Sequence, residues 1–530
     1  MTPVALFELV LVLLAAALAL SLVAGRLGFP PAAALVLGGM ALALAPRLPA
    51  FDLDPDLIMV LFLPPLLLES AYFTVWRDFR AALRPILYLS LGAVVFTTAV
   101  VGLAARAVMP DLPWAACFAL GAIVSPPDAV AAKAVLARVP LPRRLTTVLE
   151  GESLVNDASG LVLYRLAVAA ALTGGFSAWE AAGAFAWLAA SGVAIGLVLG
   201  FAVNAALRRL HDANAITVTS FLAAYAAYLT AEAVHASGVL AVVVCGLMLG
   251  GREHETFQAG VRRHAVAVWG FVVFVLEALV FVLIGLALRG VLARMGDGHG
   301  LAAALPLALA VTAACVAARF LWVYPAIHLS RLFSRREPPF LPAVPLIVGW
   351  AGMRGVVTLA AALALPIGFP GRDPILLAAF AVILFTVLVQ GTTLGPLIRR
   401  LRFRPAAPLA DGQLDTVMAR VVVNEAGLAA IATLLHPESG EPRHPVLLEQ
   451  YRRRVRATSR LRDEGAAVEA ERDAHFAAAL GAVAAGRAAL IGLHRESRIH
   501  GSVLRALEAE LDLEELHLRR MAGEAAGHGG

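Results

Sequence analysis

The chain has 530 residues, of which 60% are hydrophobic and only 15% are charged. Soluble globular domains carry about a quarter charged residues, so this composition argues against a protein that is soluble throughout. The net charge of +5 is modest and gives no indication of a nucleic-acid partner.

Apolar runs long enough to cross a bilayer recur from the N-terminus to about residue 400, and the sequence then becomes charged and rich in alanine. We therefore predict an all-α polytopic membrane protein with two domains: a transmembrane domain over 1–404 and a helical tail over 405–530 that could be regulatory. Helical spacing in the tail covers 414–436, 444–475 and 477–520. The membrane domain is predicted to hold about thirteen spans, at approximately 4–24, 30–46, 56–73, 84–108, 113–136, 145–171, 181–207, 216–235, 238–250, 265–289, 301–329, 341–368 and 374–398.

The charges of the connecting loops predict the topology. Arginine is concentrated in the loops that follow the odd-numbered spans, for example "WRDFRAALR" after the third and "RRLRFR" after the last. Cytoplasmic loops carry the excess of Lys and Arg in membrane proteins. We therefore expect the N-terminus outside and the tail in the cytoplasm, which agrees with an odd number of spans, in the inner (plasma) membrane of a bacterial cell.

The third span contains "LPPLLLES", in which two prolines precede Glu69. An ionisable residue within a span is costly and marks a functional site by default. Glu69 could line a cation path, or it could lie near the cytoplasmic end, where a charge costs little.

The fifth span is interrupted in the stretch "GAIVSPPDAV". Pro126 and Pro127 have no N–H to donate, so they free carbonyls of the preceding turn, and the span should unwind near Ser125 and Asp128. The freed carbonyls, the Ser125 hydroxyl and the Asp128 carboxylate are oxygen donors of the kind that replace the water shell of a monovalent cation. The alternative is a proline kink with a buried, paired aspartate.

The sixth span carries "GESLVNDASG". Ser153 and Asp157 share one helix face, and Glu152 and Asn156 lie on the adjoining face. A carboxylate such as Asp157 in a region of low dielectric can hold a proton or a cation, but not both favourably. This competition suits ion exchange, although a polar cluster that serves helix packing has the same pattern.

The twelfth span carries "GWAGMRG", in which Gly352 and Gly355 bracket Arg354 and allow a second helix break. Arg354 could neutralise the carboxyl ends of half-helices, pair with Glu152 or extend towards the cytoplasm. Arg319 in the preceding span is the competing partner of Glu152. Paired broken helices in the two halves of a chain are typical of a transporter site between inverted repeats.

Four motifs together resemble the bacterial sodium/proton exchangers of the cation:proton antiporter-1 family, and they occur in the expected order and spacing. The motifs are "LPPLLLES" (63–70), "SPPDAVA" (125–131), "GESLVNDASGLVL" (151–163) and "GMRGVVTLAAALALP" (352–366). The resemblance implies a thirteen-helix fold with inverted repeats and two crossed, unwound helices, which works as a homodimer by an elevator-like movement.

The resemblance also implies residue roles. Asp157 is the exchange site with Asn156 beside it, Asp128 is the aspartate of the unwound helix, Ser153 lies near the cation, and Glu152 forms an ion pair with a membrane arginine. The glutamate of the "LPPLLLES" motif corresponds to the family's glutamate after Leu-Pro-Pro.

The Asn-Asp pair further implies electroneutral exchange. The chain departs from the family at Pro127, where relatives usually have threonine, which leaves the preference between Na+ and K+ open.

The sequence thus predicts a secondary antiporter that exchanges Na+, Li+ or K+ for H+ in pH and cation homeostasis, with a second copy of the chain and membrane lipid as partners. A cation channel is the alternative transporter class. An intramembrane aspartyl protease would need a Gly-x-Gly-Asp motif, which neither aspartate has. The chain has no Walker or HExxH motif, so we expect no enzyme activity and no cofactor.

Overall fold

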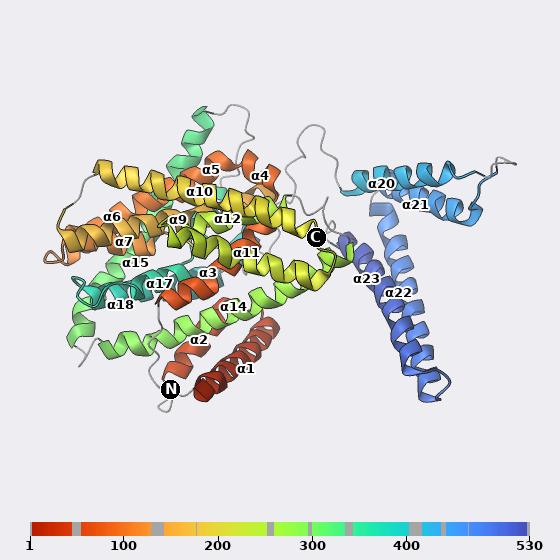
Figure 1. Cartoon of the computed structure of the whole chain (residues 1–530), viewed down its shortest axis with the longest axis horizontal. Coiled ribbons are helices and arrows are strands. Elements are labelled where there is room, and N and C mark those ends of the chain that lie inside the picture. Colours follow the sequence, from red (N-terminus) through yellow and green to blue (C-terminus); the bar gives the residue numbers. More distant parts are fainter. Residues whose placement is uncertain are drawn as a thin grey trace. The chain divides into compact units, whose positions relative to one another are not determined.

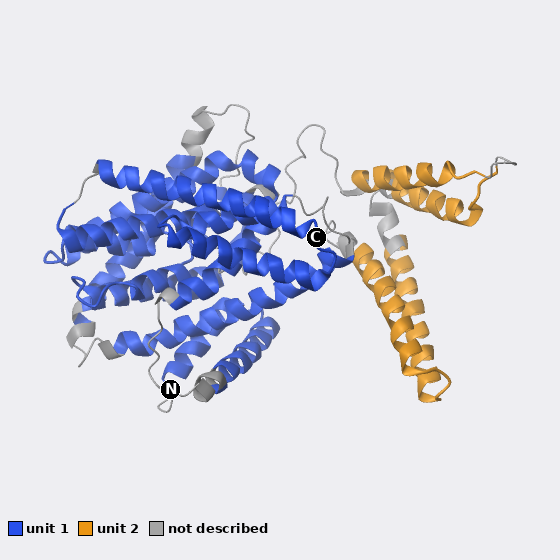
Figure 2. Ribbon diagram, in the orientation of Figure 1, with its two compact units in different colours: residues 1–405 blue, residues 406–530 orange. Residues whose placement is uncertain are grey.

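The computed structural model describes residues 3–44, 55–128, 142–175, 178–251, 259–294, 299–333, 343–401, 416–435, 441–464 and 466–526. These residues are helical between short turns, apart from an isolated bridge between Leu435 and Pro442 (Figure 1). The chain divides into two compact units, Met1–Pro405 and Ala406–Gly530 (Figure 2).

Apart from α4 (Trp76–Ala81), which lies in the predicted loop between the third and fourth spans, the helices of the first unit lie where the sequence predicts spans. This confirms the all-α membrane fold, while the count of thirteen spans stays a prediction. The helices are α1 (Pro3–Leu27), α2 (Pro31–Ala43), α3 (Pro55–Tyr72), α4, α5 (Leu83–Leu87), the π-helix η1 (Tyr88–Ala93), α6 (Val94–Val108), α7 (Trp114–Val124), α9 (Arg143–Thr173), α10 (Ala178–Leu207), α11 (Ala213–Ala233), α12 (Gly238–Gly250), α14 (Ala259–Arg294), α15 (His299–Phe333), α16 (Ala343–Trp350), α17 (Val356–Leu363), α18 (Arg372–Phe385), the π-helix η2 (Thr386–Gln390) and α19 (Gly391–Arg400).

Eight of the described helices are long and apolar enough to cross a membrane. One of these, Asp473–Arg495, lies in the second unit and owes its hydropathy largely to alanine. In the fifth predicted span, α7 covers the first half, and the second half, from residue 129 onward, lies outside the described residues.

Helix α3 continues through the adjacent prolines Pro64 and Pro65. A proline inside a helix leaves the carbonyl four residues earlier without its N–H donor, which for Pro65 is the carbonyl of Leu61. The Tyr225 hydroxyl of α11 donates to that carbonyl at 3.1 Å. The neighbouring helix therefore supplies the donor that the proline removes, as membrane helices with internal prolines require.

The helices of the first unit form two bundles. The first bundle consists of α1, α2, α3, α10, α11, α12 and α14, which pack mainly on one another. The second bundle consists of α5, η1, α6, α7, α9 and α15 to α19. The bundles meet where α3 contacts α9 and α17, where α10 and α12 contact α9, and where α14 contacts α17 and α18.

The second unit contains two helix pairs, and the stretch 477–520, which shows helical spacing in the sequence, holds parts of two helices. The pairs are α20 (Thr416–Ala432) with α21 (Pro445–Glu464), and α22 (Ala466–Arg495) with α23 (Gly501–Ala526). The chain reverses between α22 and α23 at Ser497, whose φ of 58° lies in the left-handed region that ends helices. Arg487 then bridges the two helices, because it pairs with Asp512 at 2.6 Å and Glu515 at 2.5 Å.

Helices α2 and α14 cross closely at a pair of glycines. A Cβ atom on Gly285 would overlap the backbone of α2 between Val36 and Met40, and one on Gly39 would overlap the backbone of α14 at Val282. Small residues of this kind let membrane helices approach until their backbones touch. This contact is central to the first bundle.

We predict that Gly285→Ala lowers the unfolding temperature of the protein in detergent. The added methyl group must push two backbones apart, which costs about 1–3 kcal/mol. Gly270→Ala is the matched control on the same helix, because a Cβ there meets nothing within 4 Å. The control should be neutral or gain up to about 1 kcal/mol. Equal unfolding temperatures for the two variants would contradict the close crossing.

Candidate functional site

The chain break after α7 and the break between α16 and α17 meet within the second bundle. Helix α7 ends at Val124 and the chain is non-helical through Asp128, while residues 351–355 separate α16 from α17. The Asp128 N–H donates to the Met353 carbonyl at 2.6 Å, so a backbone hydrogen bond joins the two breaks. Helix-breaking residues in each segment thus bring two irregular pieces of backbone together.

Arg354 binds the carboxyl end of α7. The Val124 carbonyl, which would accept from the Asp128 N–H in a continuous helix, accepts from Nε of Arg354 at 2.8 Å. Nη2 donates to the Ser125 carbonyl at 3.2 Å, and Nη1 donates to the Gly352 carbonyl. A guanidinium at this position satisfies unpaired carbonyls and opposes the partial negative charge of the helix end. Of the three predicted roles of Arg354, the geometry matches the first.

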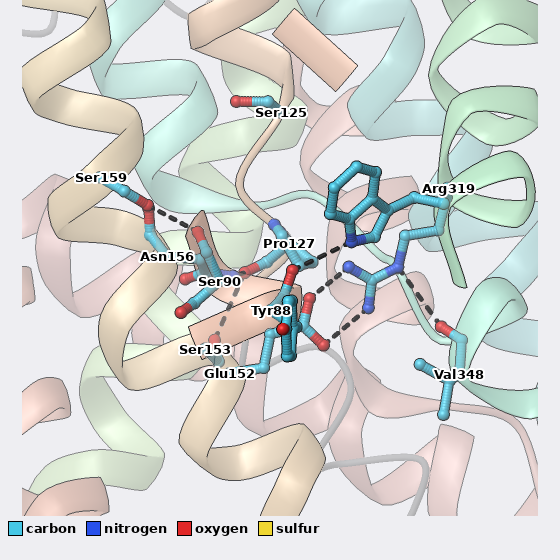
Figure 3. Close-up of polar contacts among 12 residues, drawn as sticks. Tyr88, Ser90, Ser125, Pro127, Glu152, Ser153, Asn156, Ser159, Arg319 and Val348 are labelled. Atoms are coloured by element: carbon cyan, nitrogen blue, oxygen red, sulfur yellow. Dashed lines mark hydrogen bonds and ion pairs between the residues drawn. The ribbon is translucent and has the colours of Figure 1, made fainter. Parts of the chain in front are cut away.

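The partner of Glu152 is Arg319 (Figure 3). The two guanidinium Nη atoms face the two carboxylate oxygens, with Nη2 at 2.8 Å from Oε2. Nε of Arg319 also donates to the Val348 carbonyl of α16 at 3.4 Å. Both residues are buried, at 1% and 2% exposure. This two-pronged pair ties α9 to α15 and, through Val348, to the first half of the second broken helix.

The polar face of α9 contacts the break after α7 (Figure 3). Asn156 Nδ2 donates to the Pro127 carbonyl at 2.8 Å, and the Ser153 hydroxyl lies 3.3 Å from the same oxygen. Oδ1 of Asn156 is buried and has no hydrogen-bond partner among the described residues. The amide thus holds the unwound backbone with its nitrogen and keeps an oxygen for another donor or a cation.

A cavity of about 30 Å³ lies beside these groups. A cavity of this size has room for a water molecule. Asp128, Asp157 and Ser153 line it together with apolar side chains and one hydroxyl from α3, α9 and α17. These further lining residues are Leu63, Leu66, Leu67, Ser70, Leu154, Val356 and Val357. The cavity therefore lies where the first bundle, through α3, meets the second.

Two glycines make room for this arrangement. A Cβ on Gly355 would overlap the Asp128 carboxylate, and a Cβ on Gly160 would lie 2.6 Å from the Pro126 ring. Contacts of that length require something to shift. Gly355 therefore allows Asp128 to lie against the second break, and Gly160 allows the proline to pack on α9.

Some predicted ligands lie outside the cavity lining. The Ser125 hydroxyl donates to the Ala122 carbonyl at 3.2 Å, and Glu69 is half-buried on α3. Neither residue lines the cavity, and nor does Asn156, so the roles of all three in cation binding stay predictions.

The sequence analysis missed two polar groups at or near the site. Ser70 lines the cavity, whereas its neighbour Glu69 does not. Ser70 is the last residue of the "LPPLLLES" motif, and this position could have marked it as a candidate site residue. Thr386 of η2 accepts the Arg354 backbone N–H at 3.0 Å, and no local pattern marks that threonine.

We predict that Glu152→Gln lowers the stability of the folded protein by about 3–5 kcal/mol, because it leaves the buried Arg319 charge without its anion. The control is Glu232→Gln, which breaks the partly exposed pair with Arg165, whose side chains are 32% and 45% exposed. A pair of that exposure contributes about 0–1 kcal/mol. Thermal unfolding in detergent measures both. A loss for Glu152→Gln no larger than that for Glu232→Gln would contradict the importance assigned to the buried pair.

Comparison with known proteins places the membrane domain in one family. Residues 10–400 match the family model of the sodium/hydrogen exchanger transmembrane domain. A Mycobacterium tuberculosis protein named as an uncharacterized Na+/H+ exchanger is 34% identical over 96% of each chain. A sodium, potassium, lithium and rubidium/H+ antiporter of Bacillus pumilus is 31% identical over 86% of this chain and 70% of its own.

A solved structure has the same fold. The sodium proton antiporter MjNhaP1 of Methanocaldococcus jannaschii superposes with a TM-score of 0.59 at 20% identity, over 76% of this chain and 99% of its own. The extent of the family match and the identity to relatives along nearly the whole length lead to one conclusion. The chain is a membrane protein that belongs to the sodium/hydrogen exchanger family.

Proposed function

We propose that this protein is a secondary antiporter that exchanges a monovalent cation for a proton, with the Asp157 carboxylate as the group that the two ions share. The observation that carries the proposal is the cavity at the junction of the two bundles, in which Asp157 and Asp128 face a space of about 30 Å³. Family membership supports the reaction class, because the family model is that of sodium/hydrogen exchangers.

The surroundings of Asp157 suit competition between the ions. The side chain is 6% exposed and most of the other cavity residues are leucine or valine, so little water can solvate a negative charge there. The carboxylate is neutralised either by a proton or by a cation that the nearby oxygens help to hold. One cation then replaces one proton, and the exchange is electroneutral.

The neighbouring groups have separate roles in this proposal. Asp128 and Ser153, which line the cavity, and Asn156, through its Oδ1 atom, supply further oxygens for the cation. The Glu152–Arg319 pair and Arg354 hold the broken helices and do not bind the transported ion, because their charges are already engaged.

The two bundles move relative to each other in the proposed cycle. Secondary transporters expose a central site alternately by shifting one bundle against another. Besides the helix contacts between them, the bundles are joined by an ion pair: Arg165 of α9 lies 3.0 and 2.9 Å from the two carboxylate oxygens of Glu232 of α11. In the proposed topology the N-terminus faces outward and the tail lies in the cytoplasm. The working unit is a homodimer in the bacterial plasma membrane, and its exchange serves pH and cation homeostasis.

Na+ is the first candidate substrate, and K+ is the second. The name of the Bacillus pumilus relative covers Na+, K+, Li+ and Rb+. Because that relative is 31% identical to this chain, all four ions are candidate substrates. Pro127 contributes its carbonyl to Asn156 and has no hydroxyl to offer a cation, which removes one means of preferring Na+.

We predict that proteoliposomes of the purified protein, held at an imposed pH gradient, move protons when Na+ or Li+ is added to the outer solution. Asp157→Ala should abolish this movement. At pH values where the carboxyl is mostly protonated, the apparent KM for the cation should rise about tenfold for each unit of pH decrease, because one proton must leave for one cation to bind. A pH-sensitive dye inside the vesicles measures both effects.

The control is Asp111→Ala, which removes an exposed carboxylate in the loop before α7 and should exchange normally. Parallel assays with K+ and Rb+ determine the selectivity. Normal exchange by Asp157→Ala would refute its role, and currents through single open pores would indicate a channel.

We predict that joining the bundles arrests exchange. The double variant Arg165→Cys/Glu232→Cys, treated with a short bifunctional maleimide, should lose most of its activity, because α9 can no longer move along α11. The three native cysteines are buried and should not react. Each single-cysteine variant, treated alike, is the matched control and should remain active. Full activity in the cross-linked protein would show that α9 and α11 need not move apart.

A further inference from the structure

The π-helix η1, Tyr88–Ala93, interrupts the long helix Leu83–Val108 of the second bundle. π-helices are rare, and single turns of this kind occur frequently at functional sites. In η1, the backbone carbonyls of Tyr88 and Ser90 accept hydrogen bonds from side chains of two other helices. One of those helices carries Asp157 and the other carries Arg319.

On one side, η1 is bound to α9 through Ser159. The Ser159 hydroxyl lies 2.8 Å from the Ser90 carbonyl and 2.8 Å from the carbonyl of Asn156, and its single hydrogen can go to either (Figure 3). Ser159 is 3% exposed and Ser90 is 0% exposed. The contact therefore fixes the turn of α9 that carries Asn156 and Asp157, out of reach of competing water.

On the other side, η1 is bound to α15 through Trp322. The indole Nε1 donates to the Tyr88 carbonyl at 2.9 Å, and the ring lies 5.4 Å from that of Phe96. A Cβ on Gly92 would overlap the indole, so this glycine lets the ring reach the backbone of η1. Trp322 is three residues after Arg319 and therefore lies on the same side of α15.

We propose that η1 is a positioning element of the exchange site, and that Ser159, acting through the Ser90 carbonyl, is a positioning residue for Asn156 and Asp157. This inference rests on the proposed function. Through Ser159 and Trp322, η1 sets where α9 and α15 lie relative to each other. The Glu152–Arg319 pair joins the same two helices. The position of α9 relative to α15 therefore determines how Asp157 faces the cavity.

The test is Ser159→Ala in the full-length protein, with Na+ as the probe ion. Loss of one hydrogen bond should raise the apparent KM for Na+ roughly 2- to 10-fold. It should also shift the pH profile of exchange, while the maximal rate per folded protein stays within about twofold. Ser159→Thr keeps the hydroxyl and should return the KM towards that of the wild type. Ser191→Ala is the control, because it removes a serine hydroxyl of α10 in the first bundle that bonds to the Trp187 and Leu188 carbonyls of its own helix.

Trp322→Phe tests the other contact, because it removes the indole N–H and keeps an aromatic ring. It should raise the KM for Na+ in the same direction. Trp269→Phe, which breaks an indole hydrogen bond to Ser220 at 3.0 Å in the first bundle, should leave the KM unchanged. If Ser159→Ala is poorly folded, the KM values of Trp322→Phe and Trp269→Phe decide whether η1 positions the site.

The outcomes separate this inference from the proposed function. A wild-type protein without cation-dependent proton movement would refute the function itself. An active wild type, together with unaltered KM and pH profile in Ser159→Ala and Trp322→Phe, would overturn the positioning role alone. The role is also overturned if Ser159→Thr behaves as Ser159→Ala, or if the control variants change the KM equally.

Discussion

The binding of the carboxyl end of α7 by Arg354 is the interaction on which the rest of the site depends. A backbone that unwinds inside an apolar domain exposes carbonyls that no water can satisfy, and each would cost several kcal/mol. Arg354 reaches the carbonyls of Val124, Ser125 and Gly352 with one planar group. Because Arg354 donates to these carbonyls, the chain can place Asp128 beside the cavity without leaving the carbonyls of Val124 and Ser125 unpaired.

The two buried arginines are bound by partners outside the cavity, so their positive charges are kept apart from the aspartates. Arg319 is neutralised by Glu152, and Arg354 is held by backbone carbonyls, so each cation has a fixed partner. The aspartates face the cavity instead. The proposed exchange at Asp157 needs this separation, because a permanent cation beside that carboxylate would compete with the transported ion at every step. The buried pairs thus give positional precision more than stability.

In the proposed cycle, the location of the cavity at the junction of the bundles connects its chemistry to movement. Helix α3 supplies apolar lining and the Ser70 hydroxyl from the first bundle, whereas the carboxylates belong to the second. A relative shift of the bundles would change the surroundings of the carboxylates while the second bundle keeps its own contacts. The hydrogen bonds of η1 to α9 and α15 lie inside that second bundle, where rigidity is useful.

The sequence by itself determined where most of the apolar helices lie, the two breaks and the acidic residues within the spans, because these follow from a few consecutive residues. Prolines cannot donate, glycines weaken a helix, and a carboxylate in an apolar run is visible in any window. Only the tertiary structure decided that Arg319 and not Arg354 pairs with Glu152, that Ser70 and not Glu69 lines the cavity, and that Ser159 binds η1. Arg319 and Glu152 are 167 positions apart, so their meeting depends on how whole helices pack, and local patterns carry no information about it.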